Sequence, residues 1–179
     1  MKSSRILRLA AVAAVLTVIF SLFGCAPGKY SLTGVPSEQT NTFRNVEVAP
    51  VEVGATTDEV DAETPMELRT AIIEAIQKKK MYETVVPELA NDETAIRIES
   101  KIIELENGSQ FGRWLIGGWG GKAYMEVSCR FINKASGKEF ADGTFSGEIS
   151  GGFFGGSPNQ SNMSKQVASA VVKFLKKGK

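Results

Sequence analysis

Apolar and polar residues alternate along four stretches of the chain, and this alternation predicts four β-strands. The stretches are residues 45–53, 94–106, 122–133 and 139–150. In each of them, every second side chain can face a core while its neighbours face solvent. The phase of the alternation changes near Ile102, so we expect a β-bulge in the second strand.

Two further stretches place apolar residues at the three- and four-residue spacing of an amphipathic helix. They lie over residues 64–80 and 161–177. We expect Thr64 to cap the first helix, and Ser161 or Asn162 to cap the second. Both stretches end in lysines, which the negative end of a helix dipole favours. A basic binding patch is the alternative interpretation of Lys78, Lys79 and Lys80 in the first stretch.

These elements follow one another in the order β-α-β-β-β-α. The order favours an α+β fold, with a mostly antiparallel four-stranded sheet and two helices on one face. We expect residues 44–179 to form this single domain, because their number suffices for one hydrophobic core.

The beginning of the chain has a different pattern, that of a targeting segment. Three cations, Lys2, Arg5 and Arg8, precede an apolar run that ends near Phe20, and Cys25 follows a small residue. This is the layout of a bacterial lipoprotein signal peptide, in which the cysteine sulfur receives lipid and becomes the new N-terminus. A secretory signal without lipid and an uncleaved helical anchor are the alternatives.

We therefore expect residues 1–24 to be a signal peptide and Cys25 to be lipidated. Residues 25–43 are rich in Pro, Gly, Ser, Thr and Asn, which predicts a flexible tether. Ala26 follows the cysteine. In similar lipoproteins an aspartate at that position retains the protein at the inner membrane, so its absence favours the outer membrane and a domain that faces the periplasm.

Composition narrows the possible chemistry. The 179 residues carry a formal net charge of +1, so no basic excess suggests a nucleic-acid partner. The chain has no histidine, which excludes His-dependent triads and His-ligated zinc. The acidic residues over 54–63 match no calcium-binding loop, and we interpret them as a solvated loop. We expect neither a cofactor nor a metal.

The chain has only two cysteines. If Cys25 carries lipid, Cys129 has no partner within the chain. Cys129 shares its phase in the third strand with apolar residues, so we expect it to point into the core. A reactive thiol is the alternative.

Glycines and aromatic residues gather in two segments, residues 108–121 and 143–156, which hold twelve of the 18 glycines. In an up-and-down sheet the two segments lie at the same end. Exposed aromatic side chains beside glycines are typical of a contact surface, whereas a purely structural role at the sheet edge is the alternative. The candidate partner-binding residues are Phe111, Arg113, Trp114, Trp119, Phe153 and Phe154.

Several short motifs resemble one family of bacterial lipoproteins. They are Gly108-Ser109, the run Arg113–Gly117, the step Gly120–Ala123 and the turn Ser136–Lys138. The family is catalogued as the domain of unknown function 4410. The resemblance extends over about residues 45–177, and it implies no catalytic residues.

We interpret the chain as a non-enzymatic envelope lipoprotein whose aromatic segments bind a protein partner. A carrier or sensor of lipid or glycan is the second hypothesis. An enzyme that uses carboxylates such as Asp142 and Glu148 is disfavoured, because six positions along a strand separate them by about 20 Å.

Overall fold

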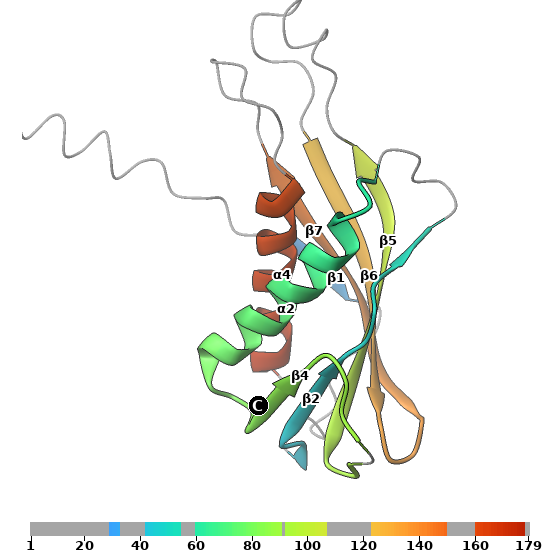
Figure 1. The fold of residues 1–179 in the computed structure, drawn as a ribbon, viewed down its shortest axis with the longest axis vertical. Helices are drawn as coiled ribbons and strands as arrows, with labels where there is room; N and C mark the ends of the chain where they lie inside the picture. Colours follow the sequence, from blue (N-terminus) through green and yellow to red (C-terminus); the bar gives the residue numbers. More distant parts are fainter. Residues whose placement is uncertain are drawn as a thin grey trace, which may run out of the picture.

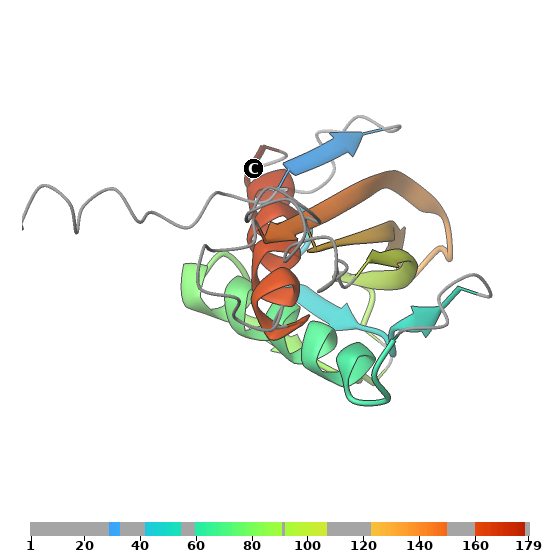
Figure 2. The ribbon, with the colours of Figure 1, turned by 90° about the horizontal axis from the view of Figure 1, so that it is seen from above.

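The computed structural model describes residues 29–32, 42–54, 60–90, 92–106, 123–149 and 160–177, which form one sheet and two helices (Figure 1). Both helices pack on the same face of the sheet, and the view from above shows the opposite face without a helix (Figure 2). The expected α+β class is confirmed. In chain order the elements are β1 (Lys29–Leu32), β2 (Asn45–Val48), β3 (Glu52–Val53), α2 (Thr64–Lys79), β4 (Thr84–Val86), β5 (Ala95–Glu106), β6 (Ala123–Asn133), β7 (Glu139–Ile149) and α4 (Gln160–Lys177).

The sheet differs from the expected one in size and in strand direction. Within the described residues it has seven strands rather than four, in the order β1-β7-β6-β5-β2-β4, and β3 pairs with β5. The long strands β5, β6 and β7 are antiparallel, as expected, but β2 runs parallel to both β4 and β5. A helical crossover is what parallel neighbours require, and α2 supplies it between β3 and β4. The predicted number of four strands is therefore wrong, and the sheet is mixed, with antiparallel pairing of its long strands and parallel pairing of β2 and β3 with β5.

Three short strands account for the difference in number. The first expected strand is divided into β2 and β3 around Pro50, which has no N–H to donate to a neighbour. β4 has three residues, too few for an alternation to be recognised. β1 lies within the expected tether and pairs antiparallel with β7. Phe43 is also buried, so the folded unit includes residues that we had assigned to the tether.

The long strands lie within one residue of their expected bounds. The register of β5 against β6 shifts between Ile102 and Glu104, which confirms the predicted bulge. Ile102 is fully buried before the shift, and Leu105 returns to the core after it. The bulge thus keeps apolar residues buried along both parts of a twelve-residue strand.

The helices begin differently from the prediction. Glu63 occupies the N-cap of α2 without a side-chain hydrogen bond. Thr64 lies one position inside the helix, and its hydroxyl donates to the side-chain oxygen of Gln160 at the start of α4. α4 begins at Gln160, so Ser161 and Asn162 are not its caps. Neither helix in the described ranges is long and apolar enough to cross a membrane.

An aromatic cluster joins α4 to the centre of the sheet. The ring of Phe174 lies 4.5 Å from that of Phe131 and 5.9 Å from that of Phe145, between centroids. All three side chains are fully buried. Because such rings bury large apolar areas, this contact fixes α4 over β6 and β7.

The first turns of α4 touch the backbone of β7. A Cβ at Gly147 would overlap the carbonyl oxygen of Met163 and lie 3.0 Å from its Cα. Only glycine allows the helix to approach so closely at this point. The side-chain amide of Gln166 then donates to the carbonyl of Glu148 and accepts from its N–H, both at 2.9 Å.

Candidate functional site

The residues predicted to carry function lie outside the described ranges. They are Cys25, Phe111, Arg113, Trp114, Trp119, Phe153 and Phe154. The structure therefore brings none of these side chains together, and it leaves their assignments as predictions.

The strand ends that flank the two aromatic segments do lie side by side. Glu106 at the end of β5 pairs with Tyr124 near the start of β6, and Tyr124 pairs in turn with Glu148 near the end of β7. Figure 1 shows these three strand ends at the upper end of the sheet. Met163 holds the start of α4 at the same end. Residues 107–122 and 150–159 are therefore both attached to this one end.

Carboxylates surround a tyrosine at this upper end, which we call the acidic end (Glu104, Glu106, Tyr124, Glu126 and Glu148). Glu104 lies directly opposite Glu126 on the neighbouring strand. The hydrogen bond that Tyr124 donates to Glu104 raises the pKa of Tyr124 to about 12, with burial and the surrounding charges adding to the effect. A shallow hollow of about 360 Å³ lies there and is lined by Tyr124, Glu126, Ser146 and Glu148.

Farther along the helix-free face, charged side chains pair with one another across three strands. Arg97 lies 3.1 Å from Glu99, Arg130 lies 3.2 Å from Glu99, and Arg130 donates to Glu139 at 2.6 Å. Beside this row is a hollow of about 450 Å³, lined by Ala49, Pro50, Glu52, Arg97, Glu99, Ser100, Lys101, Ser128 and Arg130. Its polar lining suits a charged or hydroxylated ligand.

A buried ion cluster lies at the lower end of the sheet, which we call the turn end (residues 86–90 and 134–138). The carboxylate of Glu47 accepts from the ammonium group of Lys134 and from the N–H of Leu89 at 3.2 Å, and lies 3.5 Å from Arg97. Burial alone would raise the pKa of Glu47, but the bonds from Lys134 and Leu89 and the charges of Lys134 and Arg97 together lower it. The cluster ties both turns to β2.

No pattern in the sequence points to this cluster. Glu47 occupies an outward position of an alternating strand, where exposure is the normal expectation. It is only 5% exposed because Lys134 and Leu89 cover it, and these residues lie 87 and 42 positions away. A signal that depends on near neighbours could not have found it.

Cys129 is buried in the core, as predicted. Its sulfur lies 3.4 Å from the hydroxyl oxygen of Ser100. Burial raises the pKa of the Cys129 thiol to about 12, so the reactive thiolate is not formed near neutral pH. Among the residues described here, no group of three or more acidic or cysteine side chains could hold a metal ion.

Helix side chains cover backbone groups at the sheet margins. Gln77 donates to the carbonyl of Val85 at 2.9 Å, on the outermost strand β4. Arg69 donates to the carbonyls of Val48 and Pro87, at 2.9 and 2.7 Å. With the amide pair of Gln166 on β7, these contacts satisfy groups that an open sheet edge would offer to another strand.

One protein-family model matches the part of the chain that forms most of this fold. The model of the domain of unknown function DUF4410 matches residues 35–152. The chain belongs to the DUF4410 family. The match takes in β2 to β7 and the segments with Trp114 and Trp119, which confirms the expected resemblance. No curated protein matches this DUF4410 chain.

Solved structures with the same fold include two forms of one protein. The DUF4410 chain is 15% identical to the PelC dodecamer from Paraburkholderia phytofirmans, with a TM-score of 0.55, over 83% of this chain and 98% of that chain. A variant of that dodecamer with one leucine replaced by methionine is 14% identical, with a TM-score of 0.56 and the same coverages. Lipoprotein GNA1162 from Neisseria meningitidis is more distant, at 11% identity and a TM-score of 0.40, over 59% of this chain and 82% of that chain. At these identities the likeness to PelC concerns the fold.

Proposed function

We propose that this DUF4410 chain is a non-enzymatic lipoprotein of the bacterial envelope, held in the outer membrane by lipid on Cys25 and facing the periplasm. It binds a protein partner through residues 107–122 and 150–159, with Phe111, Arg113, Trp114, Trp119, Phe153 and Phe154 as contact residues. The observation that carries this proposal is the convergence of β5, β6 and β7 at the acidic end. A sheet fixed by its core attaches both aromatic-rich segments at one place.

The chemistry of the described residues supports binding rather than turnover. The arginines of the helix-free face are paired with carboxylates, and the Cys129 thiol is buried with a raised pKa. Neither arrangement activates a nucleophile. Paired charges and a rigid sheet are, by contrast, suited to a surface that recognises another protein.

The first protein partner, we propose, is a second copy of this chain. PelC, which shares the fold over 98% of its length, forms a dodecamer. Gln77, Arg69 and Gln166 occupy backbone carbonyls of β4, β2 and β7, which removes these groups from strand pairing. Copies therefore meet through side chains on the faces of the molecule, and a membrane anchor raises their local concentration.

Lipid attachment is tested by metabolic labelling with palmitate. We expect the wild-type chain to be labelled and Cys25→Ser to remain unlabelled and to leave the membrane fraction. Ser161→Ala, which changes a residue away from the signal segment, is the control and should be labelled like wild type. Equal labelling of Cys25→Ser would overturn the anchor.

Partner binding is tested by crosslinking in whole cells followed by affinity capture. We expect Trp114→Ala/Trp119→Ala to lose crosslinked species that wild type forms. Met66→Ala is the matched control, because Met66 is an apolar side chain 66% exposed on α2 and belongs to neither aromatic segment. An unchanged set of crosslinked species, with an unchanged melting temperature, would refute the role of the aromatic segments.

A glycan carrier is the second candidate, and the hollow of about 450 Å³ on the helix-free face favours it. Its lining of Arg97, Lys101, Arg130 and two serines suits acidic or hydroxyl-rich sugars. Binding of acidic oligosaccharides by the wild-type chain, lost in Lys101→Ala and retained in Trp114→Ala/Trp119→Ala, would favour this function over protein binding.

A further inference from the structure

The helices and the long strands of this chain carry opposite charge. α2 and α4 together hold seven basic residues against two acidic ones, whereas β5, β6 and β7 hold seven acidic residues against three basic ones. The helices cover one face of the sheet (Figure 2). Along the strands, charged side chains alternate with buried ones, so they lie on the other face. A chain with a formal net charge of only +1 is thus divided into a positive and a negative face.

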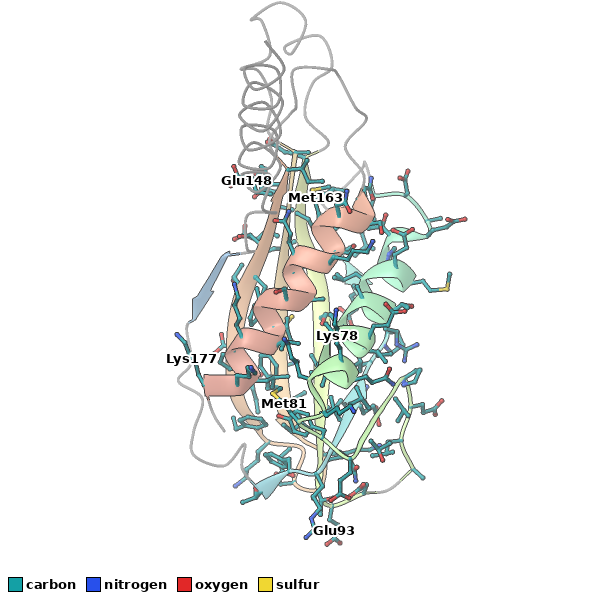
Figure 3. The ribbon with its side chains drawn as sticks, turned by 90° about the vertical axis from the view of Figure 1, so that its left-hand side faces the viewer. Lys78, Met81, Glu93, Glu148, Met163 and Lys177 are labelled. Atoms are coloured by element: carbon teal, nitrogen blue, oxygen red, sulfur yellow. The ribbon has the colours of Figure 1, made fainter. Side chains whose placement is uncertain are left out.

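On the positive face, α4 is the more uniform element. It contains four lysines and no acidic residue. Lys165, Lys173 and Lys176 are exposed along one stripe, with the exposed Ser169 between them. Lys165 and Lys173 are eight residues apart, or about 12 Å along the axis. Figure 3 shows this helix layer from outside, with Lys78 on α2 and Lys177 on α4 toward its lower part.

On the negative face, the acidic end has the strongest charge. Glu104 and Glu126 are directly opposed, and Tyr124 lies between Glu106 and Glu148 in the strand register. Two residues along a strand span about 7 Å, and three neighbouring strands span about 10 Å. The area occupied by these carboxylates therefore matches the spacing of the lysines on α4.

We propose that the lysine stripe of α4 in one copy docks on the acidic end of the next copy. The proposal rests on the proposed self-assembly and names the two surfaces that produce it. A contact between two different surfaces leaves one of each free on every pair, so it propagates into a ring or a filament. Attraction of α4 to an anionic membrane would explain the lysines alone and would leave the opposed carboxylates without a role.

The test reverses the charge of each surface separately in the full-length lipidated chain, held in a neutral detergent. The helix variant is Lys165→Glu/Lys173→Glu, and the sheet variant is Glu104→Lys/Glu126→Lys. The matched control is Glu88→Lys/Glu93→Lys, which changes two exposed carboxylates near the turn end; Glu93 lies at the lowest part of the molecule in Figure 3. Mass distributions from light scattering at several concentrations report association, and thermal melts report folding.

Each reversed variant alone presents like charges to its own copies, so we expect its dissociation constant to rise at least about tenfold. An equimolar mixture of the two variants restores opposite charges at every contact, and we expect it to associate like wild type. The control variant should associate normally. Wild-type association should weaken as salt is raised from about 0.05 to 0.5 M.

The outcomes separate the two levels of the proposal. A monomeric wild type at all concentrations overturns self-assembly together with these surfaces. Oligomers that neither variant weakens leave self-assembly in place and overturn the two surfaces. Loss of association that the mixture fails to restore also overturns them. A helix variant that associates normally but no longer binds vesicles of anionic lipid shows that α4 faces the membrane, which overturns the docking on a second copy.

Discussion

The two ends of the sheet differ in how their charged side chains are arranged, with opposite charges paired at one end and like charges opposed at the other. At the turn end, Glu47, Lys134 and Arg97 neutralise one another beneath the loop that holds Leu89. At the acidic end, Glu104 and Glu126 face each other across neighbouring strands. The first arrangement stabilises the fold, because each buried charge has a partner. The second opposes it, because like charges on facing strands repel.

The turn end is stabilised by contacts within the fold, whereas the acidic end is the surface that we propose for contact with a partner. Glu104 and Glu126 repel each other across the sheet, although Glu104 also accepts the hydrogen bond of Tyr124, and a partner with positive charge would relieve the repulsion. The turn end has no such need, because its charges are satisfied internally. Loss of a carboxylate should therefore change stability in opposite directions at the two ends, and the two ends should lose stability at opposite extremes of pH.

The largest effect is expected at the buried cluster. Glu47→Ala leaves the ammonium group of Lys134 without its carboxylate partner, and removing one member of a buried pair costs about 3 kcal/mol. Urea unfolding followed by circular dichroism measures the loss in free energy of unfolding. Lys134→Met/Glu47→Met removes both charges and should recover part of the stability. A loss below about 1 kcal/mol for Glu47→Ala would show that the cluster does not hold the turn end.

Replacing one glycine at each end with alanine also compares the two ends, because the two substitutions should cost different amounts of stability. Gly147→Ala forces α4 away from β7 at the acidic end, and we expect a loss of about 2 kcal/mol. Gly137→Ala lies in the turn at the other end, where φ is +66° and no atom lies within 4 Å of the new Cβ, so only the backbone term of about 1 kcal/mol remains. Melting temperatures in the reverse order would contradict the close contact with Met163.

The pH dependence of stability should separate the ends most clearly. The pKa of Glu47 is lowered from 4.5, so its contribution is complete above pH 4.5 and is lost as the pH falls through the folded-state value. The pKa of Tyr124 is raised from 10.0 to about 12, so its contribution is complete below pH 10 and is lost between pH 10 and 12. Unfolding free energies of Glu47→Gln and Tyr124→Phe across both ranges measure each part.

The comparison with wild type isolates each group. In Glu47→Gln, the free energy of unfolding should depend less on pH in the acid range only. In Tyr124→Phe, it should depend less on pH between pH 10 and 12 only. Tyr82, whose pKa burial also raises to about 12, stays in both variants and does not affect the difference. If the pH dependence of a variant were identical to that of wild type, the substituted group would make no pH-dependent contribution to stability.

The smallest effects are expected from single carboxylates on the helix-free face. Glu126→Gln relieves the repulsion with Glu104 and should stabilise the chain by about 0.5 kcal/mol. Glu139→Gln removes the partner of Arg130 near the turn end and should destabilise it by a similar amount. Thermal melts at low salt measure both. Shifts of the same sign would break the distinction between the ends.

The sequence predicted what depends on near neighbours. The bounds of β5, β6 and β7, the bulge after Ile102 and the inward direction of Cys129 follow from alternation, which is a local property. The parallel pairing of β2 was missed because it depends on partners beyond α2. The prediction that Thr64 caps the first helix was wrong, because its hydroxyl bonds to Gln160, 96 positions away, and Glu63 occupies the N-cap. For the aromatic residues, sequence remains the source of the prediction.

The side-chain amide of Gln166 occupies the place of one more residue of a neighbouring strand beside Glu148. This contact matters where many copies of a protein are close together, because it occupies backbone groups that could pair with a strand of a neighbour. Proteins tethered to a bilayer meet in two dimensions at high density, where an open strand invites endless templated growth. In the self-assembly that we propose, α4 closes this position from within the chain, so we expect neighbouring copies to associate reversibly and not to form fibrils. We expect Gln166→Ala to remain folded but to form thioflavin-positive aggregates at concentrations where wild type stays dispersed.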